Sequence, residues 1–167
     1  QERTDEEIFA GGYAAEALPM AHVPTTAGTG SEVTPYAILT NDAKETKTSI
    51  TSPAMFPRLA FLDGKYMEHL PVRSTVNTAL DAFSHAVEGM LSRNATPLSD
   101  ALAKESLRIL YPLLQKTAGP LTLDERDTLL YASMLAGMTI AQSGTTAVHG
   151  MGYALTYFYG IDHGRAN

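Results

Sequence analysis

Hydrophobic and polar positions follow two different patterns along the chain, and the change falls near residue 71. Before it, apolar and β-branched residues form short stretches that predict strands, bounded by turn signals such as Asn41-Asp42 and Asp63-Gly64. After Pro71, apolar positions recur every three or four residues, which is the period of an amphipathic helix. The expected strands lie at residues 17–23, 33–40 and 46–51, with a further short apolar run at 59–62.

The second pattern divides into four helical segments, at residues 76–91, 97–112, 122–144 and 148–158. Pro112 is expected to kink or end the second segment, and Thr122 with Glu125 forms a capping-box pattern at the start of the third. No further helix is expected after His163. We therefore predict a predominantly helical fold, with an N-terminal portion of mixed strands and loops (1–70) and an all-α C-terminal portion (71–167) as two domains or parts of domains.

Composition narrows the possible functions. A formal net charge of -6 argues against a nucleic-acid partner, because phosphate binding needs a basic surface. No apolar run approaches the roughly 18 residues needed to cross a bilayer, and the polar start QERTDEE is unlike a signal peptide. We expect a cytoplasmic protein with no membrane partner. The chain lacks an initial methionine and stops just after a His-Gly pair, so we expect a segment truncated at both ends.

Four residues suggest a metal site. Asp81 and His85 lie four apart on a predicted helix, so both side chains project from one face. His149 and His163 are each followed by glycine, which lets the backbone approach a site closely. With no cysteine in the chain, one carboxylate and three imidazoles could hold Fe²⁺ or Zn²⁺. Spacing alone leaves the alternatives open: a solvated polar face, a simple Asp–His pair, or histidines without metal.

A loop rich in hydroxyl groups and glycine, the Thr/Gly loop, runs from Pro24 to Thr34 and reads PTTAGTGSEVT. It contains Gly28 and Gly30, but position 33 is valine, so the dinucleotide fingerprint G-x-G-x-x-G fails. The loop can still donate hydrogen bonds to phosphate or ribose oxygens. An ordinary hydroxyl-rich turn explains the same sequence equally well. Lys47, beyond the loop, could contribute a positive charge to the binding of an anionic ligand or could simply be solvated.

Three stretches together resemble the iron-containing (group III) alcohol dehydrogenase family: PTTAGTGSEVTPYAILTN at 24–41, LDAFSHAVEG at 80–89 and HGMGYALTYFYGIDHGRAN at 149–167. The resemblance runs from about residue 18 to the end of the chain. It implies the dehydroquinate synthase-like architecture of that family, in which an α/β nucleotide-binding domain precedes a helical metal domain. Residues 1–70 would then be the tail of the first domain, and 71–167 the front of the second.

The resemblance also implies roles for individual residues. The metal ligands fall on Asp81, His85, His149 and His163. Contacts to a nicotinamide cofactor, NAD or NADP, fall on Thr25, Thr26, Gly28, Thr29, Thr34 and Lys47. Many family members carry a further histidine near the substrate, where this chain has Tyr153, which becomes the candidate catalytic proton relay although a phenol has a much higher reference pKa.

The implied reaction is hydride transfer between a small alcohol or aldehyde and nicotinamide, assisted by the metal as a Lewis acid. Alternatives are a metal-dependent hydrolase or lyase, which would leave the Thr/Gly loop unexplained, and a metal-binding fragment without activity. The family's pyrophosphate-binding loop is absent from the sequence, so we expect little dehydrogenase activity from the chain alone. Family members are commonly dimers or larger, which makes a homo-oligomer a further expectation.

Overall fold

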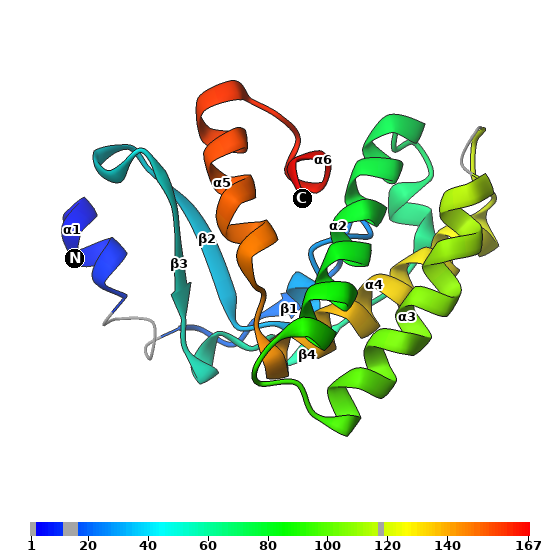
Figure 1. Cartoon of the computed structure of the whole chain (residues 1–167), viewed down its shortest axis with the longest axis horizontal. Helices are drawn as coiled ribbons and strands as arrows, with labels where there is room; N and C mark the ends of the chain where they lie inside the picture. The colour runs from blue at the N-terminus through cyan, green and yellow to red at the C-terminus, as the bar shows by residue number, and fades with distance from the viewer. Residues whose placement is uncertain (1–2, 12–16, 117–118) are drawn as a thin grey trace.

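The computed structural model describes residues 3–11, 17–116 and 119–167. Figure 1 shows a β2–β3 hairpin on one side, a group of long helices on the other, and α5 standing between them. The helices and strands are α1 (Asp5–Ala10), β1 (Ala21–His22), β2 (Tyr36–Asn41), β3 (Thr46–Thr51), β4 (Leu59–Ala60), α2 (Val72–Leu91), α3 (Pro97–Lys116), α4 (Leu123–Ser143), α5 (Ala147–Tyr159) and α6 (His163–Ala166). Short 3₁₀ turns are η2 (Ser31–Val33), η3 (Asp42–Lys44), η4 (Pro53–Met55) and η5 (Gly64–Met67).

The strands form two small sheets before residue 71. β2 and β3 pair antiparallel from Tyr36 opposite Thr51 to Asn41 opposite Thr46, and η3 connects them. β1 and β4 pair in parallel over only two positions. The strand expected at 46–51 is confirmed. The strand expected at 17–23 is only two residues long, because it has only two ladder partners, and the apolar run at 59–62 supplies them as β4. The strand expected at 33–40 begins three residues later, because η2 occupies its start.

Helices α2, α3 and α4 pack on one another through small side chains. Ala79, Ala82 and Ala86 recur along one face of α2 and are at most 1% exposed. They meet Ala103 on α3 and a row of alanines on α4 within one buried cluster. Small residues let the helix axes approach closely, and Leu110, Leu129 and Leu130 fill the remaining space. This helical unit gives α2 a fixed position from which its other buried face can carry polar groups.

Both predicted ends of α4 are confirmed. Thr122 and Glu125 form the expected capping box, with the Thr122 amide donating to Glu125 Oε2 at 2.8 Å and the Glu125 amide donating to Thr122 Oγ1 at 3.3 Å. Gly144 ends α4 with a φ of 72°, a conformation that favours glycine. Pro112 was expected to kink or end α3, and it does not end the helix, since α3 continues to Lys116. Leu113 and Leu114 beyond the proline still pack against the core, and that packing outweighs one missing helical hydrogen bond.

The end of the chain folds back on α2. The expectation that no helix follows His163 is wrong, because His163–Ala166 forms the single turn α6. Asp162 just before it accepts hydrogen bonds from Asn77 at 2.6 Å and Arg73 at 3.4 Å, both on α2. A Cβ atom on Gly164 would overlap the Asn77 carbonyl oxygen and lie 3.0 Å from Asp81 Cβ. Figure 1 shows this turn beside α2. The close approach brings His163 Nε2 to 3.6 Å from Asp81 Oδ1.

Among the residues that the structure describes, none of the helices is both long enough and apolar enough to cross a lipid bilayer.

Candidate metal centre

Asp81 is the centre of a cluster of three imidazoles. Its Oδ1 lies 3.8 Å from Nε2 of His85, 3.4 Å from Nε2 of His149 and 3.6 Å from Nε2 of His163. Ligand atoms of Asp81, His85 and His149 all lie within 4.8 Å of one another. Their side chains are about 95% buried, whereas the His163 side chain is 30% exposed. The structure thus brings the four predicted metal ligands together, with His163 on the open side.

The ring orientations suit ligation through Nε2. His85 Nδ1 lies 3.1 Å from the Gly28 carbonyl oxygen, and His149 Nδ1 contacts a Glu88 carboxylate oxygen. Both partners accept hydrogen bonds, so each Nδ1 carries the proton and each Nε2 offers a lone pair toward Asp81. The His85 and His149 rings stack with their centroids 4.6 Å apart, and His163 stands edge-on to His149 at 5.2 Å. Within the described residues, His163 Nδ1 has no hydrogen-bond partner.

The Asn167 side-chain amide marks the point on which the cluster converges. Its Nδ2 lies 3.0 Å from Asp81 Oδ1, 3.2 Å from His149 Nε2 and 3.3 Å from His163 Nε2. An amide nitrogen is a donor only, so three acceptor atoms point at one electropositive group. A divalent cation needs the same pattern. One carboxylate and three imidazoles, without thiolate, suit Fe²⁺ or Zn²⁺, so the residues fit the metal that the sequence predicts.

Burial and charge set the protonation states of the cluster. Burial raises the pKa of Asp81, but its polar contact with His149 and the surrounding imidazoles outweigh burial and hold this pKa below its usual value. Burial is the main cause that lowers the pKa values of His85 and His163, which favours neutral rings with free lone pairs. Burial also acts to lower the pKa of His149, yet its contacts with Asp81 and Glu88 raise that pKa overall. The carboxylates make His149 a more basic ligand.

The Thr/Gly loop lies directly against the cluster of Asp81 and the three histidines. A Cβ atom on Gly28 would come 2.5 Å from the Thr78 carbonyl oxygen of α2, so only glycine allows this approach. Gly30, with a φ of 59°, packs in the same way against Gly137 of α4. Thr25 and Thr29 are exposed, Thr26 is half-buried and Thr34 is buried where η2 ends. The loop therefore presents hydroxyl groups to solvent from a backbone that hydrogen-bonds His85.

Two further predicted residues lie at the open side of the cluster. The Tyr153 ring stacks on His163 with their centroids 5.7 Å apart. Burial raises the pKa of the Tyr153 phenol, and the negative charges of Asp81 and Glu88 act in the same direction. Lys47 on β3 is half-buried, and its positive charge adds to burial and the charge of His149 in lowering the pKa of His163. The structure thus places Lys47 and Tyr153 near the third imidazole.

Glu88 and Asn167 were not predicted from the sequence, although both touch the cluster. Glu88 is 2% exposed and hydrogen-bonds His149. Its position could have indicated a role, since it follows Asp81 by seven residues and His85 by three, on the same helical face. The sequence carries no comparable signal for Asn167, whose contact depends on the return of α6 to α2.

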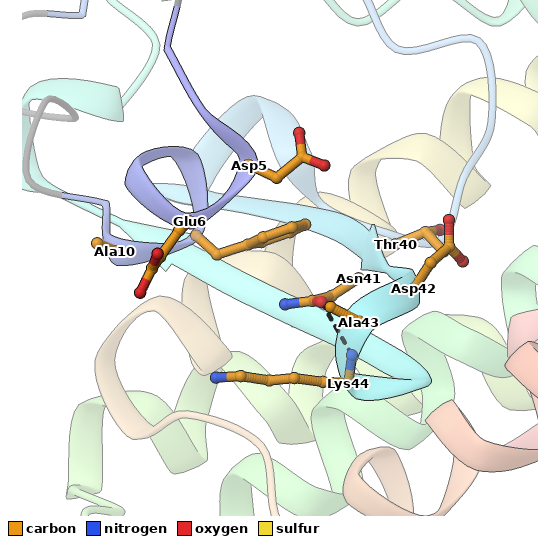
Figure 2. Close-up of a pocket in the computed structure, with 9 residues that line it drawn as sticks. Asp5, Glu6, Ala10, Thr40, Asn41, Asp42, Ala43 and Lys44 are labelled. Atoms are coloured by element: carbon orange, nitrogen blue, oxygen red, sulfur yellow. Dashed lines mark hydrogen bonds between the residues drawn. The ribbon is translucent and has the colours of Figure 1, made fainter.

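A separate cavity of about 760 Å³ lies away from the cluster, between α1 and the end of β2. Figure 2 shows Asp5 and Glu6 of α1 on one side and Asp42 and Lys44 of η3 on the other. The described residues that line this cavity include no histidine: Asp5, Glu6, Phe9, Ala10, Thr40, Asn41, Asp42, Ala43 and Lys44. The cavity therefore offers neither the predicted metal ligands nor the Thr/Gly loop.

Both parts of the chain match one known enzyme family. Residues 75–167 match the Fe-containing alcohol dehydrogenase family, C-terminal, and residues 4–64 match iron-containing alcohol dehydrogenase. The NAD-dependent methanol dehydrogenase of Bacillus methanolicus is 32% identical over 151 residues, 90% of this chain and 40% of that protein. The 1,3-propanediol dehydrogenase of Klebsiella pneumoniae is 38% identical over 150 residues, 89% of this chain and 39% of that protein.

Solved structures show the same relationship. An iron-containing alcohol dehydrogenase from Thermotoga maritima superposes with a TM-score of 0.83 at 51% identity, over 89% of this chain and 40% of that one. Sulfoacetaldehyde reductase from Bifidobacterium kashiwanohense, in complex with NAD+, superposes with a TM-score of 0.89 at 32% identity, over 99% of this chain and 45% of that one. The chain spans about 40% of the length of the curated relatives it matches. Since one family match covers residues 75–167, more than half of its length, the chain belongs to the iron-containing alcohol dehydrogenase family.

Proposed function

We propose that this chain supplies the metal centre and part of the nicotinamide site of an NAD(P)-dependent alcohol dehydrogenase acting on a small alcohol or aldehyde. The observation that carries the proposal is the contact between the two sites. The Gly28 carbonyl oxygen of the Thr/Gly loop lies 3.1 Å from His85 Nδ1, so the loop and the metal cluster are held together. This juxtaposition suits hydride transfer, for which cofactor and substrate must lie side by side.

Asp81, His85, His149 and His163 would hold Fe²⁺ or Zn²⁺. When bound, the cation acts as a Lewis acid toward the substrate oxygen. Buried Asp81 places its negative charge at the centre of the imidazoles. The Gly28 carbonyl oxygen and the Glu88 carboxylate accept hydrogen bonds from Nδ1 of His85 and His149, which keeps both rings turned toward Asp81. The Thr/Gly loop would bind the cofactor through Thr25, Thr26, Gly28, Thr29 and Thr34.

Tyr153 and Lys47 would act at the open side of the site. Stacking on His163 orients the Tyr153 ring, and its raised pKa keeps the phenol protonated at neutral pH. A protonated phenol can both donate and accept a hydrogen bond, which suits a relay between substrate and solvent. Lys47 would contribute an ammonium group to a ribose or phosphate oxygen of the cofactor.

A titration of NADH or NADPH into the Zn²⁺-loaded chain, followed by cofactor fluorescence, tests this proposal. We expect weak, saturable binding that Lys47→Ala reduces by about 10- to 100-fold, the loss expected when a charged hydrogen bond is removed. Lys44→Ala is the matched control, because Lys44 is exposed on η3 and lines the separate cavity. Metal-dependent hydrolysis of an ester or phosphoester, without any nicotinamide binding, would instead support the hydrolase alternative and contradict the proposal.

A further inference from the structure

Glu88 joins the start of α5 to the buried face of α2. Its Oε1 accepts hydrogen bonds from the Thr146 amide at 2.8 Å, the Thr146 hydroxyl at 2.6 Å and the Val148 amide at 3.1 Å. Its Oε2 accepts a hydrogen bond from Nδ1 of His149. The side chain is 2% exposed. Both oxygens of one buried carboxylate therefore accept hydrogen bonds from three residues at the start of α5: Thr146, Val148 and His149.

The two oxygens have different tasks. Amide N–H groups at a helix start are donors only and need an acceptor, which Oε1 provides at the start of α5. An ionised carboxylate is an acceptor only, so Oε2 requires a hydrogen on Nδ1 of His149. In the neutral ring Nε2 then has the lone pair, and this atom lies 3.4 Å from Asp81 Oδ1.

We propose that Glu88 is a positioning residue that fixes His149 as the Nδ1–H tautomer, with Nε2 aimed at the metal cluster, while it anchors α5 to α2. The inference rests on the metal site of the proposed function and adds a role that the four ligands do not have. Carboxylates hydrogen-bonded to ligating imidazoles commonly set ring orientation and ligand basicity.

Glu88→Gln separates the two tasks within one side chain. Thr146 and Val148 present amide hydrogens to Oε1, so the glutamine must keep its oxygen there and place its NH₂ group against His149. Nδ1 of His149 then has to accept, and the ring hydrogen moves to Nε2, the atom that would ligate. The substitution therefore preserves the helix start and its shape but removes the lone pair from the cluster.

The test measures Zn²⁺ affinity by competition with a chelator, together with ¹⁵N–¹H spectra of the His149 ring in the metal-free chain at alkaline pH. We expect Glu88→Gln to bind Zn²⁺ about 10- to 100-fold more weakly than the wild type, with thermal unfolding of the metal-free chain little changed. The His149 hydrogen should lie on Nδ1 in the wild type and on Nε2 in the variant. Thr146→Val is the matched control, since it removes one contact to Oε1, leaves the contact to His149, and should keep the wild-type affinity.

The outcomes distinguish this inference from the proposed function. If the wild type binds Zn²⁺ and Glu88→Gln binds it equally well, the positioning role is wrong and the metal site stands. An Nε2–H ring in the wild-type spectrum overturns the inference without the use of any variant. An Nδ1–H ring in a wild type that binds no metal supports the positioning of His149 and removes the proposed function.

Discussion

His149→Ala is expected to abolish tight metal binding, with the Zn²⁺ affinity of the chain falling by at least about 100-fold. Loss of a partner outside the ligand set costs about 10- to 100-fold, and a ligand should cost more. His149 connects three parts of the site, since it meets Asp81, Glu88 and the stacked His85 ring. Removing it also leaves the Oε2 of buried Glu88 without its donor. Competition with a chelator of known affinity measures the change.

His69→Ala is the control for His149→Ala, because His69 is exposed and lies outside the cluster. It should bind Zn²⁺ like the wild type. Stoichiometric metal retained by His149→Ala with wild-type affinity would remove this residue from the site. A circular dichroism spectrum of each variant checks that both remain folded, so that loss of metal is not loss of structure.

Gly164→Ala is expected to weaken metal binding by at least about 10-fold, although residue 164 carries no ligand. The new Cβ would overlap the Asn77 carbonyl oxygen and press on Asp81, both on α2. Backbone cannot yield as a flexible side chain does, so α6 must move away and take His163 with it. We also expect a loss of about 1–3 kcal/mol in the free energy of unfolding, the usual cost of overpacking. Chelator competition and denaturant unfolding measure the two effects.

The chain offers a matched control for this substitution at the other His-Gly pair. Gly150 lies within α5, and a Cβ atom there would meet no atom of the described residues within 4 Å. Gly150→Ala should keep the metal affinity and raise helix stability by about 0.5–1 kcal/mol, because alanine is the better helix former. Equal metal affinity in Gly164→Ala and Gly150→Ala would contradict the close docking of α6 on α2.

The long helices were predictable because their signals are local. Period-3.6 patterns mark α2 to α5, and the Thr122–Glu125 capping box and Gly144 mark the ends of α4. The length of β1 was not predictable in the same way, since two ladder pairs with β4 decide it. α6 is only four residues long, too short for any periodic signal, and Asp162 and Gly164 hold it in place through contacts with α2.

The same difference between local signals and tertiary contacts decides which parts of the site were predictable. Helical spacing placed Asp81 and His85 on one face, but could not tell a solvated face from a buried one. Their burial depends on tertiary packing, because α6 and the start of α5 lie against α2. Glu88 escaped prediction for the same reason, because a glutamate on a helix is usually solvated. Its spacing from Asp81 and His85 was a local signal, but its hydrogen-bond partners at the start of α5 are set by the tertiary structure.

The most direct test of the metal site is elemental analysis of the purified chain after anaerobic loading with Fe²⁺ or Zn²⁺ and removal of excess metal. We predict about one metal ion per chain, since Asp81, His85, His149 and His163 converge on a single point. A chain that retains no metal, or that retains the same amount when Asp81 is replaced by alanine, would contradict the account.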